Sequence, residues 1–255
     1  MIDWAELTLF LYITARMTGF VVFNPILGRQ NIPRIFRSGF ILVLSVFVIS
    51  FAGVNSVQIP GSVMELAFRI LLELALGYLL GLVMNFFFYI PQLAGSMIDT
   101  QMGMTMNQMY DAGSAANMSV TGQILNVLML LLFFAGGGHL TLLRMFITSE
   151  QIVPFGQVAV GLPAYQLLLE LFVECTVLSV KLCMPVLAAE LIAQVGMGVL
   201  MKVIPQINVF AINIELKVIV GLALVLVLTV PFSEFLLQAE LAMLNALHDV
   251  LALTG

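Results

Sequence analysis

The sequence predicts an all-α protein of the hydrophobic membrane type, with kinked helical segments. Hydrophobic residues fill 62% of the 255 positions and charged residues only 9%, with a mean hydropathy of +1.13. A soluble domain carries about 25% charged residues, so we expect lipid or other apolar protein to surround this chain. Prolines fall in or beside nearly every apolar run. Because lipid offers no partner for a backbone group freed by proline, the kinked segments should be sheltered by protein or line a water-filled cavity.

The first three predicted helices lie in apolar runs at residues 7–27, 38–64 and 74–98. Arg16 is the only charge in the first run, and the other two contain no charge at all. Uncharged segments of this kind are typical of membrane helices. The third run also contains the pair Gly77-x-x-x-Gly81, a pattern that favours close packing of one helix against another.

The last three predicted helices lie in residues 112–143, 165–200 and 218–233. His139 is the only ionisable residue of the first of these runs, and it follows three consecutive glycines. The second run is apolar but carries several charges and an internal proline. The third would reach about 24 Å at 1.5 Å per residue, which is short for a hydrocarbon core of about 30 Å. The six regions are therefore not simple membrane spans.

Two groups of charges recur at helical spacing, so each group should line one face of its helix. They are Glu65, Arg69 and Glu73 in one helix and Glu170, Glu174 and Lys181 in another. A charge facing lipid at mid-depth costs about 2.5–3.5 kcal/mol on insertion scales. An i,i+4 ion pair on an exposed helix returns only about 0.2–0.5 kcal/mol. We therefore expect these charge ladders to be buried against protein, or to face water at a channel wall.

A methionine-rich segment joins two of the apolar runs. Residues 95–118, GSMIDTQMGMTMNQMYDAGSAANM, contain six methionines, several glycines and amides, and no Lys or Arg. Methionine is unbranched and polarizable, so it can fill a gap that changes shape. The segment therefore indicates a deformable closure inside a pore. The alternative is that these methionines only fill a core, although the glycines and amides around them make poor core residues.

No enzyme motif is present in the sequence, which lacks GxxxxGK[ST], HExxH and GxSxG. We therefore predict no catalytic residue, no bound metal and no cofactor. The net charge of −5 and the nine scattered Lys and Arg residues provide no basic face for nucleic acid.

Several single residues are open to two interpretations. His139 could relay protons, or it could be a hydrogen-bonded residue at a helix end. Asp99 and Asp111 flank the methionines and could attract cations, or they could be helix caps or turn residues. Cys175 and Cys183 lie eight residues apart in a helical stretch and are interpreted as small core residues.

Three segments match the pattern of a known family. The first is GSMIDTQMGMTMNQMYD, anchored by Asp99, Gln101 and Gly103. The second, LLFFAGGGHLTLL, is an apolar run that ends in glycine and histidine. The third and most specific is PQINVF at residues 205–210, with Lys217 seven residues after it. The chain resembles the FliR family of flagellar type III export-gate subunits over essentially its full length. The virulence-secretion counterpart of that subunit is a close relative.

The resemblance implies a fold, a location and partners. Members of this family are built from kinked helical hairpins and look like a fusion of the FliP and FliQ folds. They join those two apolar subunits in a helical pore assembly. Residues 1–255 would form a single FliR-type domain. The gate lies in the bacterial inner membrane, in the core of the flagellar basal body, with much of it raised out of the bilayer plane. Besides membrane lipid, FlhB and FlhA are expected nearby, and unfolded flagellar proteins are the export substrates.

The resemblance also assigns roles to residues. The family's plug, which helps to close the pore at rest, corresponds here to Gln101, Met102, Gly103, Met104, Met106, Met109, Tyr110, Asp111 and Met118. The family motif and structural positions are Asp99, His139, Pro205, Gln206, Asn208, Phe210 and Lys217.

The leading hypothesis is therefore a non-enzymatic pore subunit of the flagellar protein export gate. A secondary transporter is the main alternative, with the charge ladders forming a proton or solute site at mid-membrane. Many transporters show inverted repeats, and we find no convincing repeat in this chain. The equivalent subunit of a virulence type III secretion system is a further alternative.

Overall fold

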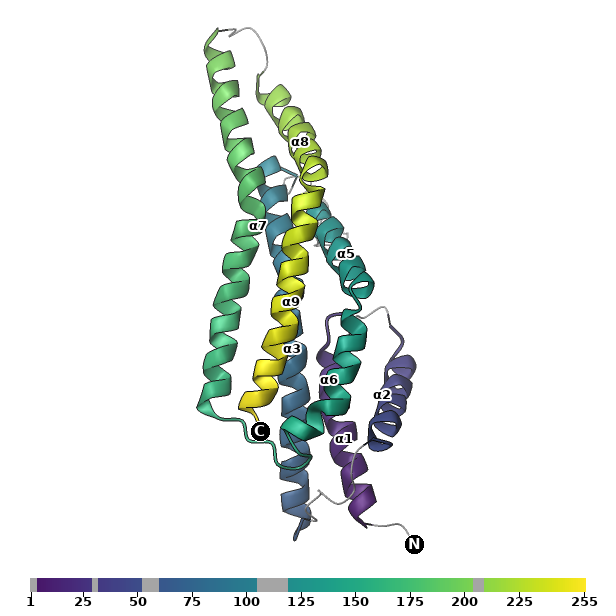
Figure 1. Cartoon of the computed structure of the whole chain (residues 1–255). Coiled ribbons are helices and arrows are strands. Elements are labelled where there is room, and N and C mark those ends of the chain that lie inside the picture. Colours follow the sequence, from purple (N-terminus) through teal and green to yellow (C-terminus); the bar gives the residue numbers. More distant parts are fainter. Residues whose placement is uncertain (1–3, 29–31, 52–59, 105–118, 204–208) are drawn as a thin grey trace. The chain divides into compact units, whose positions relative to one another are not determined.

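The computed structural model describes residues 4–28, 32–51, 60–104, 119–203 and 209–255 (Figure 1). Over these ranges the protein is all-helical, as predicted, with eight α-helices and no strand. The helices are α1 (Trp4–Phe23), α2 (Arg34–Ile49), α3 (Val63–Met102), α5 (Val120–Ala135), α6 (Gly138–Ile152), α7 (Leu162–Val203), α8 (Val209–Val227) and α9 (Thr229–Leu253).

Three of the six predicted helical regions each contain parts of two helices. The region 38–64 contains most of α2 and the first two residues of α3. The region 112–143 is interrupted between α5 and α6, where Gly137 adopts a left-handed conformation with φ 73°. Glycine adopts this conformation without the steric cost of a Cβ. The region 218–233 is interrupted at Leu228, between α8 and α9. Pro231 explains this break, because its ring clashes with the carbonyl four residues earlier, at the last residue of α8.

Two other prolines do not end their helices. Pro91 lies inside α3 and Pro185 inside α7, and both helices continue past them. The sequence pattern marks these positions as possible breaks, but most helical stability in proteins comes from packing of an apolar face, and buried residues lie on both sides of each proline. The result is two unusually long helices, of 40 residues in α3 and 42 in α7.

The lengths of α3 and α7 exceed what a bilayer needs. At 1.5 Å per residue α3 would reach about 60 Å if straight, twice a hydrocarbon core of about 30 Å. Even a tilt of about 40° would leave it to cover about 46 Å. Part of each long helix must therefore lie outside the hydrocarbon. Within the described ranges four helices are long and apolar enough to span a membrane (α1, α3, α7 and α9), with a fifth span if α5 and α6 count as one.

Contacts group the chain into two compact units. The first unit contains Met1–Phe87, Gly137–Val173 and Glu240–Gly255, and the second contains Phe88–Gly136 and Glu174–Ala239. The long helices α3, α7 and α9 contribute residues to both units. The prediction that residues 1–255 form one domain stays a prediction.

In the first unit, α1 packs closely against the first half of α3. A Cβ atom added at Gly77 of α3 would overlap the backbone carbonyl of Arg16, and one added at Gly19 of α1 would overlap that of Leu74. At Gly81 an added Cβ would lie 3.0 Å from the carbonyl carbon of Phe23. The predicted close packing at the Gly77–Gly81 pair is therefore confirmed, and Gly19 completes it from α1.

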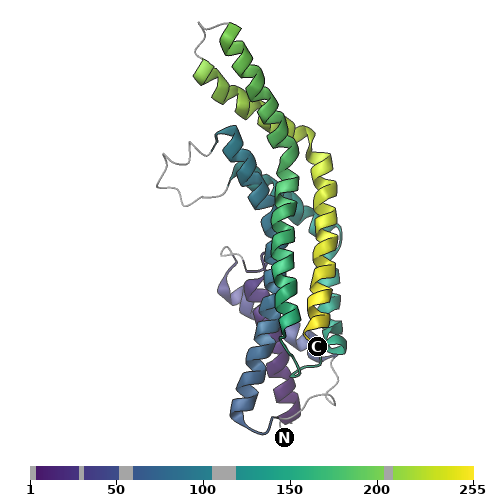
Figure 2. The same ribbon diagram turned by 90° about the vertical axis from the view of Figure 1, so that its left-hand side faces the viewer.

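In the second unit, the last part of α3 packs against α5, and α7 forms a hairpin with α8. A Cβ at Gly95 of α3 would overlap the backbone of Gly122 in α5. Figures 1 and 2 show the end of α7 and the start of α8 side by side and antiparallel. Across this hairpin the Lys217 Nζ donates a hydrogen bond of 3.4 Å to the Gln194 Oε1.

Large apolar side chains are exposed over much of the chain. Ile35 of α2 is 86% exposed, Leu162 of α7 is 76% exposed and Leu226 of α8 is 75% exposed. Monomeric soluble proteins rarely expose apolar surface on this scale. Lipid or partner subunits must therefore cover these faces.

Candidate functional site

The methionine-rich segment begins at a well-defined helix end. Gly103 follows α3 with φ 80°, its N–H donates to the Thr100 carbonyl (3.1 Å), and the Met104 N–H donates to the Asp99 carbonyl (3.0 Å). These two bonds define the Schellman motif, which favours glycine at the left-handed position. Gly103 therefore ends α3 and fixes the point at which the loop begins.

The other end of the segment is equally well defined. Ser119 is the N-cap of α5, and its Oγ accepts a hydrogen bond from the Gly122 N–H at 3.1 Å. A side-chain oxygen at this position satisfies one of the N–H groups that a helix start leaves without a partner. Residues 105–118, which lie between these two ends, are outside the described residues.

Asp99 joins the two ends of the segment. Its carboxylate Oδ2 accepts a hydrogen bond of 3.2 Å from the backbone N–H of Thr121, in the first turn of α5. Asp99 is completely buried. A carboxylate is stabilised at a helix N-terminus by the free N–H groups and the helix dipole. Of the two interpretations of Asp99 from sequence, the geometry favours the capping role. Asp111, the other acid, is outside the described residues.

Met102 is an anchor at the end of α3. Its side chain is completely buried, and a Cβ added at Gly221 of α8 would collide with it. Gly221 therefore provides the space that Met102 occupies. Of the residues predicted as plug, Gln101 and Met102 lie in the last turn of α3, and Gly103 and Met104 follow directly. Met106, Met109, Tyr110, Asp111 and Met118 are outside the described residues, so their plug role stays a prediction.

Arg16 and Glu73 form a buried ion pair between α1 and α3. The Arg16 Nε donates to the Glu73 Oε2 at 2.6 Å, and its Nη2 donates to the Glu73 Oε1 at 3.1 Å. Both side chains are completely buried. Arg16 also donates to the Ser149 Oγ at 3.0 Å and to the Val153 carbonyl at 3.2 Å. The pair therefore links α1, α3 and the end of α6 within the first unit.

This pair corrects the first predicted charge ladder. Glu73 is bonded to Arg16 and to the Gly156 N–H (2.7 Å), whereas the Arg69 Nη2 donates to the Glu65 Oε1 at 2.6 Å. The Arg69 and Glu65 side chains are 20% and 40% exposed. Helical spacing alone pointed to Arg69 as the partner of Glu73. The close approach of α1 at Gly77 instead brings Arg16 within reach.

The second predicted ladder is not buried within this chain. Glu170, Glu174 and Lys181 all lie in α7 and are exposed. Spacing placed them correctly on one helix, but it does not show what covers that helix. Any burial of these charges must come from outside the described part of the chain.

The remaining family-motif positions are spread over the fold. His139 is half-buried in the first turn of α6, and Lys217 lies in α8 with Gln194 as a partner. Phe210 falls in the first turn of α8. Pro205, Gln206 and Asn208 are outside the described residues. His139 belongs to the first unit, whereas Asp99, Phe210 and Lys217 belong to the second.

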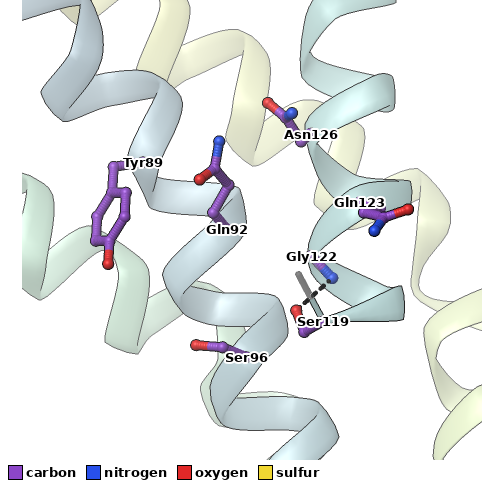
Figure 3. A pocket seen from close by; sticks show the side chains of 7 residues that line it. All are labelled: Tyr89, Gln92, Ser96, Ser119, Gly122, Gln123 and Asn126. Carbon is purple, nitrogen blue, oxygen red and sulfur yellow. Dashed lines mark hydrogen bonds between the residues drawn. The ribbon is translucent and has the colours of Figure 1, made fainter. Parts of the chain in front are cut away.

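A polar pocket between α3 and α5 was not predicted. It has a volume of about 260 Å³ and lies beside the base of the methionine-rich segment. Figure 3 shows side chains from both helices around it. The lining residues are Tyr89, Gln92 and Ser96 of α3 and Ser119, Gly122, Gln123 and Asn126 at the start of α5. Polar residues recur at helical spacing in both segments. This sequence pattern could have revealed the pocket.

The fold and these sites define an all-helical protein of the membrane type, in which a methionine-rich segment has both ends tied by Asp99. The sequence pattern of one family matches residues 7–242, which is most of the chain. The chain belongs to this family, the bacterial export proteins, family 1.

Curated relatives match nearly the whole chain. The flagellar biosynthetic protein FliR of Bacillus subtilis (strain 168) is 27% identical over 256 residues, which covers 96% of this chain and 95% of the relative. FliR of Escherichia coli (strain K12) is 26% identical and covers 96% of this chain and 94% of its own length. The Yop proteins translocation protein T of Yersinia pestis is also 26% identical, with 96% and 93% covered.

Proposed function

We propose that this protein is a non-enzymatic pore subunit of a flagellar type III protein export gate. The observation that carries this proposal is the family match over residues 7–242, together with FliR relatives that cover nearly the full chain. The four apolar helices support a place in the bacterial inner membrane. The gate forms part of the flagellar basal body.

The subunit assembles with homologues of FliP and FliQ. Two features of this chain support an assembly of this kind. Its helices expose large apolar side chains, and α3 and α7 are too long to lie entirely in hydrocarbon. Neighbouring subunits would cover the exposed apolar surface and the charged face of α7 outside the bilayer. FlhB and FlhA are the expected neighbours of the assembled gate.

Residues 101–118 act as a plug that helps to close the pore at rest. Apolar constrictions block ions because water leaves them. Methionine side chains adapt to a passing chain of any sequence, so they can close again around or behind an unfolded export substrate. Asp99 and Ser119 support this role, because their hydrogen bonds hold the two ends of the segment in place.

Co-expression with the FliP and FliQ homologues of the same organism tests the assembly. The three proteins should co-purify in detergent as one complex of defined size, and deletion of this subunit should abolish export of flagellar proteins. Isolation as a stable monomer that transports a solute into liposomes would contradict the proposal and support a secondary transporter.

A virulence type III secretion system is the second candidate. The Yersinia pestis relative is as similar in identity and coverage as the Escherichia coli FliR. Complementation separates the two, because a flagellar subunit should restore motility to a fliR-deficient host and a virulence subunit should not.

A further inference from the structure

The polar pocket between α3 and α5 is unusual in a chain with so little polar surface. Tyr89, Gln92 and Ser96 occupy one face of α3 at spacings of three and four residues. Ser119, Gln123 and Asn126 do the same on α5. Residues at these spacings share a helix face, and both sets line the same pocket. Figure 3 shows Gln92 and Asn126 in the space between the two helices.

Asn126 has an unused hydrogen-bonding atom in this pocket. The residue is only 7% exposed, and its Oδ1 has no hydrogen-bond partner in the described part of the chain. Buried side-chain oxygens nearly always have a partner, and leaving one without a partner is costly. A molecule that enters the pocket could donate a hydrogen bond to the Asn126 Oδ1.

The lining restricts the chemistry of that molecule. Among the described residues, those that line the pocket carry no charge and provide only amide, hydroxyl and backbone groups. A phosphate group would lack a cation, and a metal ion would lack carboxylate or imidazole ligands. Amides and hydroxyls offer both donors and acceptors, which is the combination that a peptide group requires.

The size of the pocket fits a short stretch of chain. Its volume of about 260 Å³ is close to the lower limit of ligand cavities, about 300 Å³. A backbone N–H could donate to the Asn126 Oδ1, and a backbone carbonyl could accept from the Gln92 amide. Backbone groups are the same for nearly every residue type, so this recognition would tolerate varied sequences.

We propose that this pocket binds the backbone amide groups of an extended segment of the exported polypeptide. The inference rests on the proposed function, because it takes an unfolded protein as the export substrate. It adds a binding site beside the tied ends of the plug segment, where a passing chain is held by hydrogen bonds that do not depend on its sequence.

Site-specific photo-crosslinking in the assembled gate tests this inference. A photoreactive amino acid replaces Gln92, and a flagellar export substrate fused to a stably folded domain is stalled in transit. We expect a crosslink from position 92 to the stalled substrate. The same amino acid at Val127, which is 52% exposed on α5 and does not line the pocket, is the matched control and should give no such crosslink.

A substitution provides the second measurement. Asn126→Leu keeps the size of the side chain but removes the acceptor, so export should fall about two- to tenfold, the range expected for loss of one hydrogen bond. Val127→Leu should export normally. Crosslinks from position 92 to other subunits or lipid alone, or unchanged export by assembled N126L gates, would overturn the inference. Co-purification with the FliP and FliQ homologues does not depend on either result. A failure of this inference can therefore be told apart from a failure of the proposed function.

Discussion

The Arg16 guanidinium and the Glu73 carboxylate form a completely buried ion pair, with two hydrogen bonds of 2.6 and 3.1 Å between α1 and α3. Removal of one partner from such a pair leaves the other charge buried without compensation. Arg16→Leu should therefore destabilise the protein by about 3–5 kcal/mol, seen as loss of complex yield and a lower unfolding temperature in detergent.

The double variant R16L/E73L is the control for this prediction. Replacement of both charges by apolar residues of similar volume is often close to neutral, so the double variant should be more stable than R16L. Arg69→Leu should cost about 0–1 kcal/mol, because Arg69 is partly exposed and Glu73 keeps its own partner. A loss from R69L as large as that from R16L would show that the ladder, and not the buried pair, holds these helices.

Gly77 and Gly39 should respond in opposite ways to alanine. A Cβ at Gly77 would overlap the backbone of α1, whereas nothing lies within 4 Å of a Cβ at Gly39 in α2. Gly77→Ala should destabilise by about 1–3 kcal/mol through overpacking. Gly39→Ala should be neutral or stabilise by up to about 1 kcal/mol, because alanine suits a helix interior better. Thermal unfolding of the two purified variants compares them directly, and equal stabilities would contradict the close contact.

Asp99 should be needed to keep the plug segment in place. Asp99→Ala removes an acceptor for the Thr121 N–H, and loss of a capping side chain costs about 0.5–2 kcal/mol. We expect assembled D99A gates to leak ions in a conductance assay, while Asp99→Asn, which keeps an acceptor oxygen, should leak less. Thr100→Ala, an exposed neighbour in the same turn, should behave as wild type. D99A gates that conduct no more ions than wild-type gates would argue against a role for Asp99 in holding the ends of the segment.

The predicted plug can be tested by composition as well as by length. Deletion of residues 103–116 should make the closed gate conduct ions, because no side chains then fill the constriction. The triple variant M104G/M106G/M109G should also leak, since glycine leaves the gap unfilled. The matched M104L/M106L/M109L variant keeps apolar volume and should stay closed. Wild-type conductance in the deletion variant would count against the plug assignment.

The sequence was sufficient for the helices but not for their partners. Long uncharged runs predicted the helical regions, and the Gly77–Gly81 pair predicted a close helix contact, because both depend on local composition. Pro91 and Pro185 did not interrupt their helices. Packing of the residues around a proline decides whether the helix continues past it. The partner of Glu73 could not be found from spacing along α3, because Arg16 reaches it only after α1 has packed.

The site shows the same division between local and tertiary information. A cap at Asp99 was one of its two interpretations from sequence, and the hydrogen bond to the Thr121 N–H favours it. The role of Gly103 at the end of α3 was not predicted. The pocket formed by Gln92 and Asn126 needed the pairing of α3 with α5, which close contact between Gly95 and Gly122 establishes. Polar residues at helical spacing could be seen in each segment, but nothing in the sequence showed that the two sets line one pocket.

A density map of the gate extracted with its FliP and FliQ homologues tests the central claim most directly. That claim is that residues 101–118 close the central passage, with the ends of the segment held by Asp99 and Ser119. The account predicts density for this segment across the pore axis in the resting complex. Density for the segment on the outer rim, away from any passage, would contradict it.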